Sequence, residues 1–199
     1  MRIAFLNAGC WIFDLDGTLT QPVHDFEYIR RQLGFASGAD ILATIARQSD
    51  DVRADLQYRL DELELFYASK AKASDGALSL LRKLAEKDCR LGILTRNKKE
   101  IAISSLQAIG AAEFFPANAV IGRDQAAAKP NPQGINILLG RWQARADDAV
   151  MLGDFRYDLE VGRAAGVATI HVDSRPGLEW PELTDLKVSS LDQLLHLIV

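Results

Sequence analysis

The feature that most constrains the fold is a regular alternation of short apolar stretches and amphipathic stretches, which begins at Ser74. The short apolar stretches predict strands, and the stretches between them carry apolar side chains at helical spacing. Strands that alternate with helices indicate a parallel sheet, because the chain must cross over before each new parallel strand. The sequence therefore predicts an α/β fold, a doubly wound parallel sheet. The expected strands are an opening strand that runs into Ile12-Phe13, then 90–94, 119–121, 149–152 and 167–172.

The stretch from residue 21 to residue 73 has a different pattern. Its apolar residues recur at helical spacing over 24–33, over 39–48 and from about residue 50 onward, and no strand pattern interrupts them. A chain of 199 residues is long enough for one domain with an inserted subdomain. We therefore expect 1–20 and 74–199 to form an α/β core domain, with 21–73 inserted as a small helical subdomain after the first strand.

Two aspartates one residue apart follow the opening strand, in the run Ile12-Phe13-Asp14-Leu15-Asp16-Gly17-Thr18. A strand places alternate residues on the same face, so Asp14 and Asp16 are expected on one side of the sheet. Two carboxylates about 4 Å apart repel each other by several kcal/mol at an effective dielectric constant of about 20. A cation or a shared proton relieves such crowding, and crowded acids often mark functional sites. An acidic turn after an edge strand is the ordinary alternative.

Three further polar clusters fall at predicted strand ends or in the loops beyond them: Thr95-Arg96-Asn97, Lys129, and Asp154 with Asp158. Each alone has an ordinary structural explanation, such as a solvated lysine or acids at a helix N-terminus. In an open α/β sheet, ligands bind outside the carboxyl ends of the strands, where all of these residues would converge. Several carboxylates with one hydroxyl and one ammonium group suit Mg²⁺ and a phosphoryl group, because Mg²⁺ prefers oxygen ligands.

The composition of the chain limits which molecules it is expected to bind and where in the cell it is expected to be found. The net charge of −4 and the pI near 5.4 argue against a protein that binds nucleic acid or an anionic membrane. The two cysteines, Cys10 and Cys89, fit neither a zinc cluster nor a disulfide framework, so the cytoplasm is expected. Ala8-Gly9-Cys10 resembles the end of a lipoprotein signal, but the apolar run 3–6 before it is too short for one. No apolar run is long enough to span a membrane.

Taken together, these motifs resemble those of the haloacid dehalogenase superfamily. The family's first motif, Asp-x-Asp-Gly-Thr, matches 14–18, and its second, a Thr or Ser ending a strand, matches Thr95. Its third motif, a lysine often followed by proline, matches Lys129-Pro130, and its fourth, Gly-Asp-x-x-x-Asp, matches 153–158. The helical insertion resembles the family's C1 cap, although it is shorter than in typical phosphoglycolate phosphatase-like members. Ser74-Asp75-Gly76-Ala77 also stands where such members often show Pro-Gly-Ala.

The resemblance implies a Rossmann-like core and a role for each motif residue. Asp14 is implied to be the nucleophile that forms an aspartyl-phosphate, and Asp16 the acid that protonates the leaving alcohol and then activates water. Thr95, Lys129 and the backbone near Arg96 and Asn97 are implied to bind the substrate phosphate. The implied Mg²⁺ ligands are Asp14, Asp16 through its backbone carbonyl, and Asp154, with Asp158 as a ligand or just behind them.

The resemblance also bears on the reaction. Dehalogenases lack the second acid, because a halide leaving group needs no proton, so Asp16 favours phosphoryl transfer. The resemblance implies a Mg²⁺-dependent phosphatase that hydrolyses a small phosphorylated metabolite. A phosphomutase of the β-phosphoglucomutase type is the alternative, and a non-catalytic binding protein on the same scaffold is a further one. The sequence predicts no particular substrate and no particular oligomeric state.

Overall fold

The computed structural model describes residues 4–173, 175, 177 and 179–198, and it contains a six-stranded sheet in the order β3-β2-β1-β4-β5-β6. Every neighbouring pair of strands is parallel, as the alternation in the sequence predicts. The terminal residues 1–3 and 199, which we expected in the core domain, lie outside the described residues, as do 174, 176 and 178. The strands are β1 (Cys10–Phe13), β2 (Arg90–Leu94), β3 (Val120–Ile121), β4 (Ala149–Gly153), β5 (Ala168–Val172) and β6 (Leu186–Val188).

Helices cover both faces of the sheet, which confirms the doubly wound arrangement. Alternate side chains of β1 point to opposite faces: Trp11 and Phe13 pack into one apolar cluster, and Cys10 and Ile12 into another. The first cluster is completed by α4 (Ala77–Glu86), α5 (Lys99–Ala108) and α8 (Leu191–Leu197). The second is completed by α6 (Gln133–Trp142) and α7 (Arg156–Ala165). Short 3-10 turns are found at Ala4–Asn7, Ala112–Phe114, Ala117–Ala119, Ala146–Asp148 and Pro181–Leu183.

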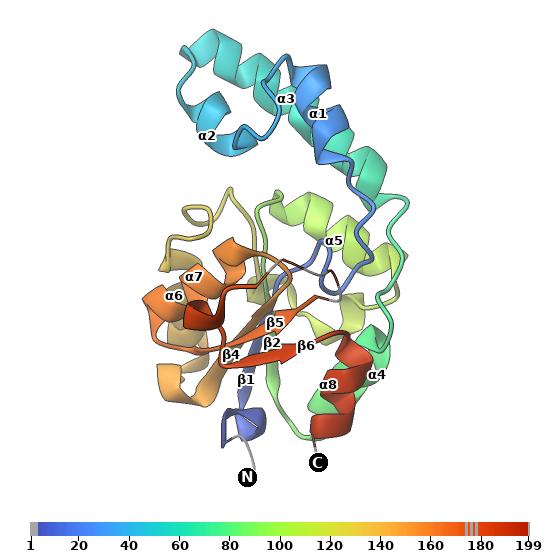
Figure 1. Ribbon diagram of the computed structural model, residues 1–199, viewed down its shortest axis with the longest axis vertical. Helices are drawn as coiled ribbons and strands as arrows, with labels where there is room; N and C mark the ends of the chain where they lie inside the picture. The colour runs from blue at the N-terminus through green and yellow to red at the C-terminus, as the bar shows by residue number, and fades with distance from the viewer. Residues whose placement is uncertain (1–3, 174, 176, 178, 199) are drawn as a thin grey trace.

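The segment after β1 is helical, as predicted, and consists of α1 (Phe26–Leu33), α2 (Ile41–Ala46) and α3 (Asp50–Ala68). Figure 1 shows these helices gathered at the end of the molecule opposite both chain termini. They have a small apolar core of their own, formed by Ile29, Leu33, Ile45, Leu56 and Leu60. We call 21–73 the helical segment below.

The chain enters and leaves the helical segment through two connections that lie side by side. The backbone N–H of Gln21 donates to the Lys72 carbonyl at 2.8 Å, and Thr20 and Ala73 form an isolated antiparallel bridge. The side-chain amide of Gln21 also donates to the Ala73 carbonyl, at 3.1 Å. These contacts lie at the boundaries that the sequence predicts for the inserted subdomain.

One strand was missed by the sequence reasoning. β6 is only three residues long, it lies at the edge of the sheet, and the exposed Lys187 stands at its centre. A short edge strand with a charged centre has neither the length nor the continuous apolar character that marked the buried strands. Among the described residues, no helix has the length and apolarity needed to cross a membrane.

A close approach between α4 and α8 generates a test of the fold. Gly76 precedes α4 with φ of 82°, and a Cβ there would lie 2.3 Å from the backbone nitrogen of Asp192 in α8. Gly110 has a similar φ of 72°, but nothing lies within 4 Å of the position of its Cβ. Gly110→Ala should therefore cost only the left-handed backbone penalty, about 1–2 kcal/mol of unfolding free energy.

Gly76→Ala should cost about 1–3 kcal/mol more than Gly110→Ala, because the added methyl group must also displace the start of α8. Urea unfolding of both variants measures the difference. Equal losses in the two variants would contradict the close packing of α8 against Gly76.

Candidate active site

The predicted site residues meet at one edge of the sheet, beyond the carboxyl ends of three neighbouring strands. Asp14 follows β1, Thr95 follows β2, and Asp154 follows β4. The adjacent strands bring these side chains close together because β1 pairs with both β2 and β4. Lys129 reaches the same place from the loop between β3 and α6, and Asp158 from the first turn of α7. Asp14, Thr95, Lys129 and Asp158 are all buried.

Lys129 lies between two of the carboxylates. Its ammonium group donates to Asp14 Oδ1 and to Asp158 Oδ1, each at 2.5 Å, and all three side chains are at most 10% exposed. Burial alone would lower the pKa of Lys129, but the two adjacent carboxylates outweigh burial and raise it. Lys129 therefore stays protonated and offsets the negative charge around Asp14.

Lys129 and Arg175, whose Nη2 contacts Asp154 Oδ2 at 3.0 Å, do not neutralise all the acids at this edge. Oxygen atoms of Asp14, Asp154 and Asp158 lie within 4.8 Å of one another. Burial, together with repulsion from Asp14 and Asp158, raises the pKa of Asp154 to about 8. Burial also raises the pKa of Asp158 to about 6, with Lys129 opposing the shift. Such an all-oxygen set with excess negative charge fits a hard divalent cation.

The loop after β1 allows Asp154 to come close. Gly17 has φ of 89°, and a Cβ at this position would lie 2.6 Å from Asp154 Oδ2. Any larger residue would collide with that carboxylate and would also adopt an unfavourable left-handed backbone. The glycine of the Asp-Gly-Thr sequence therefore leaves the space that the Asp154 carboxylate occupies beside the loop.

Asp16 has surroundings unlike those of Asp14. It contacts a neutral partner, because the side-chain amide of Asn97 donates to Asp16 Oδ2 at 2.7 Å. Burial, followed by repulsion from Asp14 and Glu64, raises the pKa of Asp16 well above its usual range. The two aspartates of the motif thus differ: Asp14 is paired with an ammonium group, and Asp16 is held where the protonated form is favoured.

The residues after β2 take two directions. Thr95 is buried, and its Oγ1 accepts a hydrogen bond from the backbone N–H of Asn97 at 3.0 Å. The side chain of Arg96 instead turns to the helical segment, where its Nη2 donates to Asp40 Oδ1 and Oδ2 at 2.9 and 2.8 Å. Tyr157 donates to the same carboxylate at 3.3 Å and lies under the Arg96 guanidinium. The backbone carbonyls of Arg96 and Asn97 accept from Arg123, at 2.8 and 3.0 Å.

The helical segment contributes residues that the sequence reasoning missed. His24, which we interpreted as part of a helix, precedes α1 and lies with its Nδ1 3.6 Å from Asp16 Oδ1. Burial lowers the pKa of His24 to about 4, so it is neutral at pH 7. Glu64 of α3 is also buried, four residues after Leu60 on the apolar face of the helix. An acid within an apolar stripe was the signal that could have revealed it.

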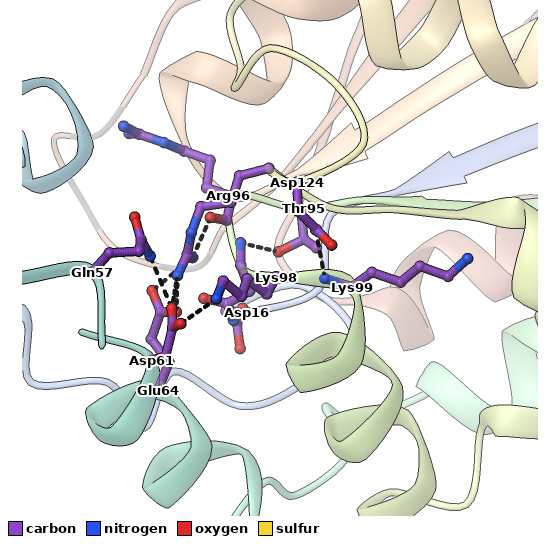
Figure 2. Close-up of polar contacts among 11 residues, drawn as sticks. Asp16, Gln57, Asp61, Glu64, Thr95, Arg96, Lys98, Lys99 and Asp124 are labelled. Atoms are coloured by element: carbon purple, nitrogen blue, oxygen red, sulfur yellow. Dashed lines mark hydrogen bonds and ion pairs between the residues drawn. The ribbon is translucent and has the colours of Figure 1, made fainter. Parts of the chain in front are cut away.

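Glu64 belongs to a cluster of charges between α3 and the core. Figure 2 shows Asp61 and Glu64 reaching from α3 toward the loop that carries Arg96 and Lys98. Arg123 donates from Nη1 to Glu64 Oε1 at 3.1 Å and from Nη2 to Glu64 Oε2 at 2.8 Å, and it also contacts Asp61 at 2.7 Å. Lys98 forms a further ion pair with Asp61. Burial raises the pKa of Glu64 to about 7, against the opposing effect of Arg123.

A cavity of about 430 Å³ lies between the acidic cluster and the helical segment, a volume typical of small-molecule sites. Its core side includes all eight predicted site residues: Asp14, Asp16, Thr95, Arg96, Asn97, Lys129, Asp154 and Asp158. The helical segment provides the opposite side with residues of α1, α2 and α3. The cavity is therefore shared between the core and the helical segment, with the predicted site residues on the core side.

The fold and the site define an α/β protein in which buried carboxylates gather beyond the carboxyl ends of parallel strands. Residues 11–172 match the family described as haloacid dehalogenase-like hydrolase. The chain belongs to this family, as the four sequence motifs predicted, and family membership makes it a hydrolase.

Relatives and solved structures agree with this assignment. Pyrophosphatase PpaX from Listeria monocytogenes is 30% identical over 185 residues, which cover 81% of this chain and 81% of that protein. Phosphoglycolate phosphatase from Rhodospirillum rubrum is 30% identical over 187 residues, which cover 80% of this chain and 77% of that protein. The structure of CbbY from Rhodobacter sphaeroides in complex with phosphate has the same fold, with a TM-score of 0.75 and 19% identity over 94% of this chain and 96% of that chain.

The central position of Lys129 generates a stability prediction. Lys129→Met should leave Asp14 and Asp158 buried without their cation, and it should lower the unfolding free energy by about 3–5 kcal/mol at pH 7 in a chelator. Lys187→Met is the control, because Lys187 pairs with Glu179 at a more exposed place. Its cost should stay below about 1 kcal/mol.

The deficit of Lys129→Met should shrink as the pH falls below neutrality. The pKa of Asp158 is raised to about 6 from the usual 3.8 although Lys129 opposes the shift, so without Lys129 this pKa lies higher still, and the folded variant gains more stability from proton binding on acidification than the intact protein does. Stability then rises as the pH falls through this window. Denaturant titrations at several pH values measure the effect, and a deficit that grows on acidification would contradict it.

Proposed function

We propose that this protein is a Mg²⁺-dependent phosphatase that hydrolyses a small phosphate monoester through an aspartyl-phosphate. The observation that carries the proposal is the contrast between the two aspartates of the first motif. Asp14 is paired with Lys129, whereas Asp16 contacts the neutral Asn97 amide and has a raised pKa. Two neighbouring carboxyl groups with different surroundings suit a nucleophile and a proton donor.

In the first step of the proposed reaction, a carboxylate oxygen of Asp14 attacks phosphorus, and the bond from phosphorus to the alcohol oxygen breaks. The protonated carboxyl of Asp16 donates its proton to the departing alcohol. In the second step, the ionised Asp16 takes a proton from water as that water attacks the aspartyl-phosphate. Asp14 is released with inorganic phosphate, and Asp16 regains its proton, so the two steps close a cycle.

The other residues act on charge and position. Lys129 offsets the negative charge that surrounds the phosphoryl group, and it keeps Asp14 in place through their contact at 2.5 Å. Thr95 Oγ1 and backbone amides of Arg96 and Asn97 are proposed to donate to phosphoryl oxygens. The side chain of Asn97 orients Asp16, and Asp158 orients Lys129.

The acidic cluster fits Mg²⁺ because its donors are all oxygens and Lys129 leaves its charge incompletely balanced. Asp14, Asp154, Asp158 and the backbone carbonyl of Asp16 would hold the ion. When bound, Mg²⁺ supplies positive charge that lets the substrate phosphate approach these carboxylates.

The relatives support the reaction class, since one is named a pyrophosphatase and the other a phosphoglycolate phosphatase. We propose that the helical segment, 21–73, acts as the cap domain over the core, because it forms one side of the cavity. Free Cys10 and Cys89 agree with the expected cytoplasmic location.

The nucleophile is tested with Asp14→Asn. A panel of phosphate monoesters with Mg²⁺ should give inorganic phosphate with the intact protein, and kcat/KM should fall at least about 10³-fold in the variant. Asp147→Asn is the matched control, because Asp147 pairs with Arg145 far from the site and is largely exposed. Full activity of Asp14→Asn would refute the assignment. Isomerised sugar phosphate in place of free phosphate would favour the phosphomutase alternative.

The proton donor is tested with Asp16→Asn and two esters whose alcohols differ in acidity. The first step should slow more for an alkyl phosphate than for 4-nitrophenyl phosphate, because only the alkoxide needs a proton to leave. With the nitrophenyl ester, the variant should accumulate phosphorylated protein after acid quenching, since water lacks its base. Equal rate losses for both esters and no accumulation would exclude this role.

The metal is tested by thermal unfolding with and without Mg²⁺. The raised pKa values of Asp154 and Asp158, about 8 and about 6, mean that protons compete with the ion and that the metal-free protein loses stability as the pH rises. The increase in Tm caused by Mg²⁺ should therefore be larger at about pH 8.5 than at about pH 6. Asp154→Asn should lose the increase, and Asp147→Asn should keep it. A larger increase at the lower pH would contradict the proposed ligands.

A further inference from the structure

We propose that the part of the substrate attached to the phosphoryl group is uncharged and largely apolar. The inference rests on the proposed phosphatase function and specifies its substrate class. The protein would then hydrolyse phosphate esters of neutral alcohols, and it would discriminate against substrates that carry a second phosphate or a carboxylate. The argument comes from the side of the cavity that faces the acidic cluster.

This side of the cavity is mainly apolar. The helical segment contributes five apolar side chains to the lining, and the core adds two aromatic rings next to them. These residues are Phe26, Ile29, Ile41, Leu42 and Leu60 from the helical segment, with Phe155 and Tyr157 from the core. A leaving group bound here would lose contact with water and would be surrounded mainly by carbon, which favours apolar groups.

The cations that line the cavity already have carboxylate partners. Lys129 pairs with Asp14 and Asp158, and Arg96 donates to both carboxylate oxygens of Asp40. Arg30 contacts Glu27 at 2.8 Å and donates from Nε to a backbone carbonyl. An anionic leaving group would therefore have to displace an existing carboxylate to gain a cation.

Arg175 completes the set of cavity cations, and it too is paired. Its Nε donates to both oxygens of Asp173 at 2.9 and 3.0 Å, and its Nη2 contacts Asp154 at 3.0 Å. Among the described residues that line the cavity, every lysine and arginine thus has at least one carboxylate partner.

The acids on the helical side of the cavity also disfavour an anionic leaving group. Asp40 and Glu64 both line the cavity, and each is neutralised by an arginine. Figure 2 shows Glu64 and Asp61 near Lys98. Arg123 pairs with both acids and Lys98 pairs with Asp61, so the two cations balance the two acids. A second phosphate or carboxylate placed here would lose its contact with water and would find no free cation among the described lining residues to replace it, so its binding would be disfavoured.

The polar atoms near the cavity that have no partner suit an uncharged leaving group. Within the part of the chain that the structure describes, His24 Nε2 and Arg96 Nε are buried nitrogen atoms without a hydrogen-bond partner, and both residues line the cavity. Neither atom is accessible from the cavity as it stands, so each would have to turn toward it to bond a polar atom of the alcohol, and neither bond needs a charge on the ligand. An apolar alcohol with one or two such polar atoms matches this lining.

The test compares esters that differ in charge but little in shape. Phenyl phosphate and 4-carboxyphenyl phosphate form one pair, and propyl phosphate and phosphoglycolate form a second pair of small alkyl esters. With Mg²⁺ present, kcat/KM should be at least about tenfold higher for the neutral member of each pair. Pyrophosphate should be as poor a substrate as the carboxylated esters.

A failure of the proposed substrate class and a failure of the proposed phosphatase function give different results. Equal or higher kcat/KM for the charged esters would overturn the substrate class and leave the phosphatase function standing. Absence of phosphate release from every ester, together with absence of phosphorylated protein, would overturn the proposed function itself and this inference with it.

A variant tests the cause of the preference. Asp40→Asn removes the charge that neutralises Arg96, while the asparagine oxygen can still accept the backbone N–H of Ala43 that Asp40 accepts at 2.9 Å at the start of α2. The preference for phenyl phosphate should fall at least about fivefold, mainly through a lower KM for the carboxylated ester. Asp147→Asn should leave the ratio unchanged.

An unchanged ratio in a folded Asp40→Asn would overturn the explanation from charge pairing. If that variant does not fold, Glu27→Gln provides the same test, because it frees Arg30 on the same side of the cavity. The comparison of neutral and charged esters with the unmodified protein decides the substrate class in either case.

Discussion

The contact of the Lys129 ammonium group with Asp14 and Asp158 is the interaction on which the site depends. β1 and α7 bring these two carboxylates to the same buried place, and the loop after β3 brings the lysine between them. A buried ion triplet of this kind contributes little net stability, because its desolvation offsets its attraction. The arrangement therefore agrees with the proposed reaction, in which Lys129 holds the Asp14 carboxylate beside a positive charge.

The residues at strand ends were predictable because topology alone places them. Asp14, Thr95 and Asp154 follow three strands that lie next to one another, and any parallel sheet with this order brings such residues together. Lys129 and Asp158 were candidates for the same reason, because they lie in the loop or helix that follows a strand, but only the family resemblance gave each of them a role. The fold class was predicted for the same reason as the strand ends, because alternation of strands and helices allows few other arrangements.

The contributions of the helical segment were not predictable in the same way. His24, Asp40 and Glu64 enter the site only because three helices pack together and then lie against the core. Helical spacing shows which residues share one face of a helix, but it does not show which part of the protein that face packs against. Glu64 lies on the buried face of α3, and its partner Arg123 is 59 residues away in the chain, so no local pattern links them.

The two sides of the cavity differ in charge, and this difference separates the chemistry from the selection of substrate. The core side has crowded acids, and the raised pKa of Asp16 suits the proton transfer that we propose for it. The opposite side consists of apolar residues and neutralised ion pairs. In the proposed reaction, the apolar residues that would contact the alcohol could therefore change with little effect on the charges around phosphorus, whereas Glu64 could not, because it raises the pKa of Asp16.

The paired connections at Gln21 and Lys72 have an evolutionary consequence. The chain leaves the core and returns to it at adjacent points, held by a backbone hydrogen bond of 2.8 Å. Lengthening an insertion closed in this way costs little, because loop-closure entropy grows only with the logarithm of length. The core can therefore accept longer, shorter or unrelated inserts at this position, and new substrate ranges can arise by replacement of one contiguous piece of the gene.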